Sequence, residues 1–322
     1  MELQISITDL CNYSCIMCMQ QAHEGLYDAK DRIIPRLHNG NRGFIDKKVF
    51  KKILEDTKYI EFDLLKMQWN GESFIHPGIT GLINILREYT NFKRIVFTTN
   101  VSVINQKIIE ALKTLNINIQ FVLSIDSFDQ NIYKKIKGID NIHKVEKNID
   151  LLKKQLPKAI FTFQAIAMNE NKHNIKEFID YIKSKYLIDE IIWDEPLIYK
   201  KDSNHIFIKK LGAFNQLKYD EIHKNLFYDL IENKDYIITA WDGKGIRKPC
   251  VGPFTTPTFN WDGRMTYCCM DSELELSPGN IIDKSFEKLW NSKNSQQLRN
   301  AHLDKNADLY PRCKRCLNLN KI

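Results

Sequence analysis

The stretch LQISITDLCNYSCIMC, residues 3–18, decides how the rest of the chain is interpreted. Its first five residues, Leu3–Ile7, alternate apolar and polar side chains, as a half-buried β-strand does. Cysteines follow at positions 11, 15 and 18, so three thiols stand on a short loop directly after this strand. The carboxyl ends of strands are where barrel enzymes build their active sites. We therefore expect a functional centre at the N-terminal loop.

The spacing of these three cysteines, C-x3-C-x2-C, suits an iron–sulfur cubane. Three thiolates on a short loop reach three corners of one cubane, whereas a structural zinc site or a closed iron–sulfur site takes four protein ligands. Three protein ligands leave one iron open to an exchangeable ligand, which is the open-site logic of metal catalysis. The motif therefore favours a catalytic cluster.

The other five cysteines lie near the C-terminus, at positions 250, 268, 269, 313 and 316, and none lies between 19 and 249. Free core cysteines would be scattered through the chain, and a disulfide framework does not suit a reducing compartment. Clustering at short spacings instead indicates metal ligands.

Length and composition set the class of protein. A chain of 322 residues suggests about two domains, and its 43% apolar and 27% charged residues are typical of a globular protein. No apolar stretch approaches the ~18 residues of a membrane span, and the N-terminus is not a secretory signal. We expect a cytoplasmic protein without a membrane partner. The net charge of +7 comes from scattered lysines, which argues against a nucleic-acid partner.

Short apolar segments alternate with helical patterns through the middle of the chain. The expected strands are 65–69, 94–99, 120–125, 160–167 and 190–194, and the expected helices are 47–57, 79–89, 106–115, 141–154 and 175–185. Asp46 is the expected N-cap of the first helix. With the first strand these form six β/α units, which right-handed crossovers wind into an open barrel. Another parallel α/β fold remains the alternative.

The cysteine loop after the first strand resembles that of the radical S-adenosylmethionine (SAM) enzymes, which carry C-x3-C-x2-C on a partial (β/α)6 TIM-type barrel. The resemblance implies an α/β fold of this type, with a SAM-binding [4Fe–4S] cluster held by Cys11, Cys15 and Cys18. Its open iron chelates SAM, and reduction yields a 5′-deoxyadenosyl radical that abstracts hydrogen from a substrate carbon. An external electron donor such as flavodoxin or ferredoxin is also implied.

Further segments at the strand ends resemble the family's SAM contacts. The resemblance assigns SAM binding to Gly71 and Glu72 after the second strand, Asn100 after the third, Ser124 and Asp126 after the fourth, and Met17 within the loop. Two departures are visible: Val101 follows Asn100 where the family often has glycine, and Met17 replaces an aromatic residue. We expect Ser124 and Asp126 to share one strand face. The alternatives are an ordinary turn at 71–72 and a helix cap at 124–127.

The C-terminal cysteines form a second set. Cys250 and Cys268 are spaced as C-x12-G-x4-C around Trp261-Asp262-Gly263, an expected hairpin turn. On spacing alone zinc competes with iron–sulfur. The stretch resembles the SPASM domains of radical SAM enzymes and their shorter relative, the twitch domain. That resemblance implies an auxiliary [4Fe–4S] cluster held by Cys250, Cys268, Cys313 and Cys316. We expect a barrel over 1–215, a connector that could face substrate over 216–249, and a twitch-type domain over 250–322.

The expected activity is that of a radical SAM oxidoreductase acting on a carbon of a small polar, carbohydrate- or aminocyclitol-like substrate. Only ten residues precede Cys11, which disfavours a peptide substrate that needs a leader-binding domain. Cys269 is the spare thiol: it is a packed thiol beside a ligand, an alternative ligand to Cys268, or a catalytic hydrogen-atom donor, as in an epimerase. A peptide-modifying enzyme, a zinc-binding adaptor and an RNA-modifying enzyme remain as alternatives.

Overall fold

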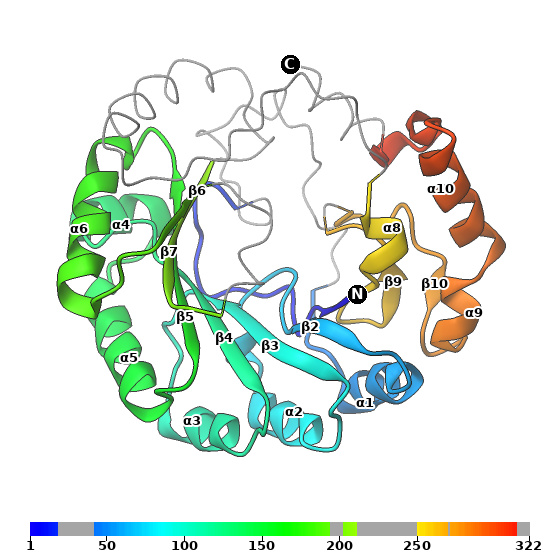
Figure 1. Cartoon of the computed structure of the whole chain (residues 1–322), viewed down its shortest axis with the longest axis horizontal. Helices are drawn as coiled ribbons and strands as arrows, with labels where there is room; N and C mark the ends of the chain where they lie inside the picture. The colour runs from blue at the N-terminus through cyan, green and yellow to red at the C-terminus, as the bar shows by residue number, and fades with distance from the viewer. Residues whose placement is uncertain (19–41, 194–201, 211–249, 270, 314–322) are drawn as a thin grey trace.

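The computed structural model describes residues 1–18, 42–193, 202–210, 250–269 and 271–313. Strands and helices alternate through most of the described residues up to position 210, as the sequence predicts. They are β1 (Glu2–Ile5), α1 (Lys47–Thr57), β2 (Phe62–Lys66), α2 (Ile79–Leu86), β3 (Phe92–Thr99), α3 (Gln106–Lys113), β4 (Asn118–Ser124), α4 (Gln130–Lys137), α5 (Ile142–Gln155), β5 (Ile160–Ala167), α6 (Ile175–Tyr186), β6 (Ile191–Trp193) and β7 (His205–Lys210). Figure 1 shows α1–α6 outside a curved sheet.

The described strands form one sheet in the order β10-β9-β8-β1-β2-β3-β4-β5-β7-β6. All pairings from β1 to β7 and β6 are parallel, which confirms the α/β barrel class. The expected sixth strand exists as β6, but it is not the neighbour of β5. That place belongs to β7, which pairs Thr162 with His205. Strand order depends on packing between segments, so the local pattern at 190–194 could not reveal it.

The N-termini of two helices show why the chain turns where it does. Asp46 caps α1 by accepting a hydrogen bond from the Lys48 amide at 2.7 Å, which confirms the predicted cap. Helix α4 is not among the helices expected from the sequence pattern, and Asp129 caps it in the same way. This helix ends at Gly138, whose φ of 73° lies in the left-handed region that glycine adopts without strain.

The two faces of the barrel strands differ in chemistry. Residues such as Ile95, Phe97, Phe121 and Phe163 belong to the buried apolar core that packs under the helices. Side chains alternate along a strand, so their neighbours point into the barrel. Those neighbours include buried polar groups joined across β3, β4, β5 and β7. Arg94 Nη1 donates to Gln120 Oε1 (3.1 Å), Gln120 Nε2 to Thr162 Oγ1 (2.9 Å), and Thr162 Oγ1 lies 3.1 Å from His205 Nε2.

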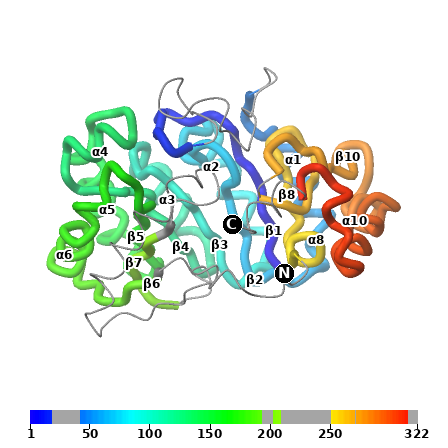
Figure 2. The backbone as a smooth tube through the Cα atoms, turned by 90° about the horizontal axis from the view of Figure 1, so that it is seen from above, coloured from blue at the N-terminus to red at the C-terminus, as the bar shows by residue number. Residues whose placement is uncertain are grey.

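The C-terminal part contains α8 (Gly252–Thr255), β8 (Thr258–Phe259), β9 (Arg264–Thr266), β10 (Gly279–Asn280), α9 (Phe286–Trp290) and α10 (Lys293–Leu303). Short 3-10 turns lie at Ser73–Ile75, Lys172–Asn174 and Ala307–Leu309. Phe259 pairs with Met265 in an antiparallel hairpin, which confirms the turn predicted at 261–263. In Figures 1 and 2 this part lies beside β1, on the side away from β6.

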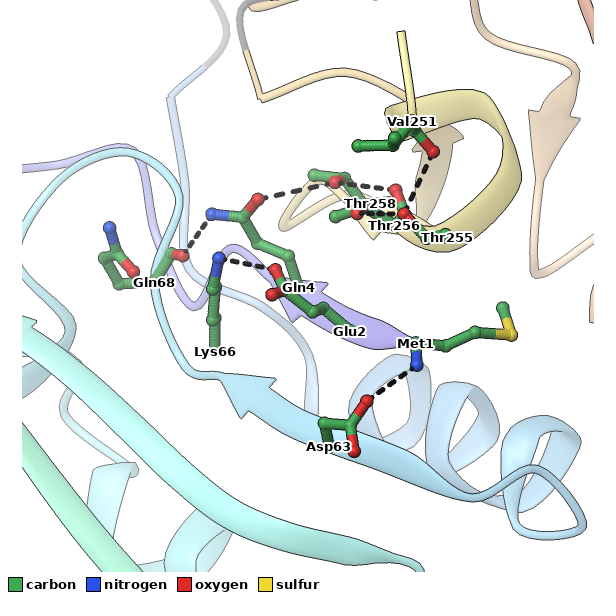
Figure 3. Close-up of polar contacts among 10 residues, drawn as sticks. All are labelled: Met1, Glu2, Gln4, Asp63, Lys66, Gln68, Val251, Thr255, Thr256 and Thr258. Atoms are coloured by element: carbon green, nitrogen blue, oxygen red, sulfur yellow. Dashed lines mark hydrogen bonds and ion pairs between the residues drawn. The ribbon is translucent and has the colours of Figure 1, made fainter. Parts of the chain in front are cut away.

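One sheet runs from the barrel into the C-terminal part, because β8 pairs in parallel with β1. Figure 3 shows the side chains at this junction. Gln4 Nε2 donates to the carbonyl of Gln68 at 2.8 Å, and Gln4 Oε1 accepts from Thr258 Oγ1 at 3.4 Å. Gln4 thus ties the end of β2 to the first strand of the C-terminal hairpin. Among the described residues, no helix is long and apolar enough to cross a membrane.

Candidate cluster sites at the two ends of the chain

The N-terminal cysteine loop is anchored on α4 through its backbone. The amide of Ser14 donates to the Lys137 carbonyl at 3.3 Å, and the amide of Ile16 donates to the Ile136 carbonyl at 2.9 Å. The Tyr13 hydroxyl adds a side-chain anchor, since it lies 3.0 Å from the Tyr133 hydroxyl. The carbonyls at the end of this helix lack helical partners, so the loop satisfies groups that otherwise need water.

The three thiols of the loop form a donor set whose fit to a cluster can be judged from its chemistry. Cys11, Cys15 and Cys18 lie close enough to affect one another electrostatically. Within the described ranges, however, no three Cys, His, Asp or Glu side chains converge as ligands of one metal ion. A cubane takes each thiolate at a different iron, so its ligands need not converge on a single point. The donor set therefore fits a [4Fe–4S] cluster.

Burial controls the protonation of two of these thiols. It raises the pKa of Cys11 to about 11 and that of Cys15 to about 12. Both thiols are thus neutral at pH 7 until a cation compensates the thiolate charge. A cluster held by these thiolates would therefore release protons on binding.

Gly71 allows the turn after β2 to approach the cysteine loop. Its φ is 68°, and a Cβ placed on it would lie 2.3 Å from the carbonyl oxygen of Leu10, the residue before Cys11. The same carbonyl accepts a hydrogen bond from the Glu72 amide at 2.8 Å. Only glycine permits this contact, so Gly71 positions the start of the cysteine loop.

Glu72 is predicted to bind the amino group of SAM, but its carboxylate contacts other groups of the chain. It accepts hydrogen bonds from the Phe74 amide (3.2 Å), the Thr99 hydroxyl (2.9 Å) and the Asn100 amide (2.7 Å). The side chain is buried, and burial raises its pKa despite these donors. In this arrangement Glu72 joins the ends of β2 and β3. SAM binding by Glu72 stays a prediction.

Asn100 and Ser124 both lie at the carboxyl ends of their strands, as predicted. Asp126 lies beyond β4 in a left-handed turn with φ of 69°, so it does not share a strand face with Ser124 as expected. The two side chains still meet the same amine. Lys137 Nζ forms an ion pair with the Asp126 carboxylate and donates to Ser124 Oγ at 3.3 Å. Asp129 caps the following helix, so Asp126 is not the cap that the alternative reading offered.

Lys137 is the site residue that the sequence analysis missed. It is 1% exposed and lies below the cysteine loop, close enough for the charges of Asp126 and Cys15 to affect it. Burial by itself would lower its pKa, but those charges and the hydrogen bond that Lys137 Nζ donates to the Asp126 carboxylate raise it overall. Only the packing of α4 against the end of β4 brings Lys137 and Asp126 together, and no spacing rule signals that contact.

Met17 packs at the edge of a small apolar cluster formed by Ile16, Ile136 and Met168. Its thioether is a polarisable surface beside the cysteine loop. A contact between Met17 and SAM stays a prediction.

The C-terminal cysteines come from separate elements. Cys250 is exposed and precedes α8, Cys268 is half-buried and follows β9, and Cys313 is buried beyond α10. Cys316 lies outside the described residues. A Cβ on Gly252 would lie 2.6 Å from the Tyr267 carbonyl and 3.6 Å from Cys250 Sγ, so the segments carrying Cys250 and Cys268 pack together. His302 Nε2 lies 3.6 Å from Cys313 Sγ.

Asp271 fixes the turn that follows Cys268. Its buried carboxylate accepts hydrogen bonds from the Thr266 hydroxyl (2.6 Å) and from the amides of Glu275 (2.9 Å) and Leu276 (3.0 Å). Its own amide donates to the Cys268 carbonyl at 3.0 Å. One carboxylate thus organises both sides of the turn.

Cys269 is exposed, and its carbonyl accepts a hydrogen bond from Trp69 Nε1 at 2.7 Å. Trp69 follows β2, so this contact joins the barrel to the C-terminal part. A catalytic role for the Cys269 thiol stays a prediction, as do the ligand roles of the other cysteines.

Comparisons with known proteins match both cysteine-bearing parts of the chain. The model of the radical SAM superfamily matches residues 5–182, and that of the SPASM iron–sulfur cluster-binding domain matches residues 250–317. GTP 3′,8-cyclase of Clostridium perfringens is 23% identical over 76% of this chain and 65% of its own length. GTP 3′,8-cyclase of Clostridium botulinum is 24% identical over 94% of this chain and 90% of its own length.

The fold is similar to that of native anSMEcpe with bound AdoMet, with a TM-score of 0.64 at 17% identity over 94% of this chain and 83% of that chain. The superfamily match alone covers more than half of the chain. With its SPASM domain, the chain belongs to the radical SAM superfamily, and its cofactors are SAM and iron–sulfur clusters.

Proposed function

We propose that this radical SAM enzyme abstracts hydrogen from a carbon of a small polar, carbohydrate- or aminocyclitol-like substrate and oxidises it. SAM bound at a reduced cluster supplies the 5′-deoxyadenosyl radical for that step. In this proposal Cys11, Cys15 and Cys18 hold the SAM-binding cluster. Cys250, Cys268, Cys313 and Cys316 hold the auxiliary cluster that accepts electrons, and flavodoxin or ferredoxin supplies the reducing electron.

The polar interior of the barrel carries the substrate proposal. Arg94, Gln120, Thr162 and His205 are buried on the inward strand faces and form a hydrogen-bonded row. Gln164, 8% exposed, lies on the same face of β5, two residues beyond Thr162. These groups pair with one another toward the amino ends of their strands, so they make the barrel interior polar without contacting substrate themselves. A hydroxyl-rich substrate is therefore favoured over an apolar one.

The curated relatives support the same class. Their name, GTP 3′,8-cyclase, places their chemistry on a nucleotide and involves its ribose 3′ position. The matched region spans 65% of the length of the Clostridium perfringens relative, so its whole activity does not transfer to this chain. What the two have in common, in this proposal, is a small polar substrate with a sugar-like carbon.

The test uses anaerobically reconstituted, reduced protein incubated with SAM and a panel of sugars, aminocyclitols, nucleotides and peptides. We expect 5′-deoxyadenosine to rise with one of the polar small molecules, whose product is two hydrogens lighter by mass spectrometry. Cys11→Ala is the matched negative control, since it removes one proposed ligand of the SAM-binding cluster. If a peptide of the panel is turned over and none of the small molecules is, the proposed substrate class is wrong.

Epimerisation is the second candidate, because an exposed thiol lies where the C-terminal part meets the barrel. The Trp69 contact holds the backbone of Cys269 beside the end of β2. In this reading the Cys269 thiol returns a hydrogen atom to the substrate radical. Epimerisation in D2O would place one solvent deuterium in a product of otherwise unchanged mass, and Cys269→Ala would stop it. Oxidation would proceed in Cys269→Ala.

A further inference from the structure

We propose that Asn100 is a positioning residue of the N-terminal cluster, with its side-chain amide donating a hydrogen bond to Sγ of Cys11. The amide nitrogen lies 3.9 Å from this sulfur. This role differs from the SAM contact that the sequence predicts for Asn100. The inference rests on the proposed function only in taking Cys11, Cys15 and Cys18 as cluster ligands.

The orientation of the Asn100 amide follows from an unambiguous donor. The backbone amide of Ser102 lies 3.0 Å from Oδ1 of Asn100. A backbone N–H can only donate, so the side-chain atom facing it is the oxygen. The NH2 group is then the end that faces Cys11. A reversed amide would place two donors against each other at Ser102.

A closed ring of hydrogen bonds holds this orientation. Ser102 Oγ donates to Asn100 Oδ1 at 2.6 Å, and Asn12 Nδ2 donates to Ser102 Oγ at 2.8 Å. Asn100 Nδ2 completes the ring by donating to Asn12 Oδ1 at 3.0 Å. An amide nitrogen carries two hydrogens. The ring uses one of them, which leaves the other for Cys11.

The backbone around Asn100 is equally constrained. Its amide donates to Glu72 Oε2 at 2.7 Å. The next residue, Val101, is fully buried in the left-handed region with φ of 62°, which is strained for a β-branched residue and is kept only where the surroundings enforce it. Asn148 Nδ2 donates to the Val101 carbonyl at 2.6 Å. Asn100 itself is 7% exposed, so little water competes for its amide.

The consequence concerns the reduction potential. Hydrogen bonds to the sulfurs tune the potential of an iron–sulfur cluster. Donors at a thiolate favour the reduced state, because that state carries more negative charge. Cys11 Sγ has two such donors among the described residues, the Asn100 side chain and the Tyr13 amide at 3.4 Å. Removing the Asn100 donor therefore makes the N-terminal cluster harder to reduce.

The experiment is a redox titration of the reconstituted holoenzyme followed by electron paramagnetic resonance, with the auxiliary cluster in the same sample as reference. Asn100→Asp keeps the side-chain shape but replaces the NH2 group with oxygen. We expect the midpoint potential of the N-terminal cluster alone to become more negative. Ser102→Ala, which adds no charge and leaves the Asn100 amide in place, gives a smaller shift in the same direction.

Asn105→Asp is the matched control. Asn105 is the N-cap of α3 and accepts from the Ile108 amide at 3.1 Å, a role that aspartate also fills. The control makes the same chemical change on the same connecting segment, and we expect the potential of the N-terminal cluster to stay at the wild-type value. An equal shift in Asn105→Asp and Asn100→Asp would show a general charge effect and overturn the proposal.

The proposal is also overturned if the potential is unchanged in Asn100→Asp and Ser102→Ala while SAM binding, measured by equilibrium dialysis, weakens. That result would assign Asn100 to SAM. If Asn100→Asp does not retain its cluster, the neutral Ser102→Ala variant decides whether Asn100 acts on Cys11 or on SAM. Absence of a second cluster signal from the unmodified protein would count against the ligand set of the proposed function instead.

Discussion

The two cysteine regions are supported by different parts of the fold. The loop of Cys11, Cys15 and Cys18 lies against α4 and against the ends of β2 and β3, and burial suppresses the ionisation of Cys11 and Cys15. Of the C-terminal cysteines that the structure describes, Cys250 and Cys269 are exposed, Cys268 is half-buried and Cys313 is buried. A closely packed barrel end holds the first set, whereas segments on three separate elements carry the second.

This difference indicates which interactions fix the ligand geometry at each site. Buried polar groups such as Glu72 and Lys137 form hydrogen bonds and an ion pair that fix the conformation around the N-terminal loop before any cluster binds. Proteins hold reactive constellations in this way, with supporting residues that fix the ligands. In the C-terminal part, the described cysteines Cys250, Cys268 and Cys313 stand on separate segments, and a cluster held by them would link these segments and contribute to folding there. Three substitutions test this contrast.

The largest effect is expected for Lys137→Met, which leaves the buried Asp126 carboxylate without its cation. Breaking a buried pair costs about 3–5 kcal/mol. Urea unfolding of the reduced apo-protein should show this loss of stability. After reconstitution, the same variant should bind less iron at the N-terminal site. Lys134→Met on the same helix is the control, because its pair with Asp140 is solvent-exposed and worth about 0–1 kcal/mol. Equal midpoints for the two variants would refute the buried role.

Gly71→Ala should have the next largest effect. The added methyl group meets the Leu10 carbonyl at 2.3 Å on a backbone with positive φ, a combination that costs about 2–4 kcal/mol of overpacking and strain. We expect this variant to lose the iron of the N-terminal cluster, half of the total, while the auxiliary cluster remains. Gly81→Ala inside α2 is the control: nothing lies within 4 Å of its Cβ, and it should gain about 1 kcal/mol of helix stability. Retention of both clusters in Gly71→Ala would be the contrary result.

Asp271→Ala should have the smallest effect and the opposite pattern. It leaves the Thr266 hydroxyl and the amides of Glu275 and Leu276 without their acceptor, at a cost of about 1–3 kcal/mol. Iron analysis should show loss from the auxiliary site with the N-terminal cluster intact. The exposed Asp283→Ala serves as the control and should change stability by less than about 0.5 kcal/mol. Loss of both clusters in Asp271→Ala would remove the contrast between the two regions.

Local patterns along the chain predicted most of the secondary structure. The α1 cap at Asp46, the hairpin at 261–263 and the parallel strands of the barrel all follow from residue types and spacing, and the structure confirms them. Helix α4 was missed, although Asp129 and Gly138 bound it with a standard cap at each end. Strand β7 was missed because its place depends on which segment packs beside β5.

The sequence by itself determined the two sets of cysteines and, through them, the superfamily, because thiol spacing is a local property that needs no fold to be read. The tertiary structure decided what surrounds those thiols. It placed Lys137 under the loop, engaged the Glu72 carboxylate with β3 and turned the Asn100 amide toward Cys11. These contacts join residues 11 to 89 positions apart. They arise from the packing of parallel strands and helices, and no local pattern of residues records them.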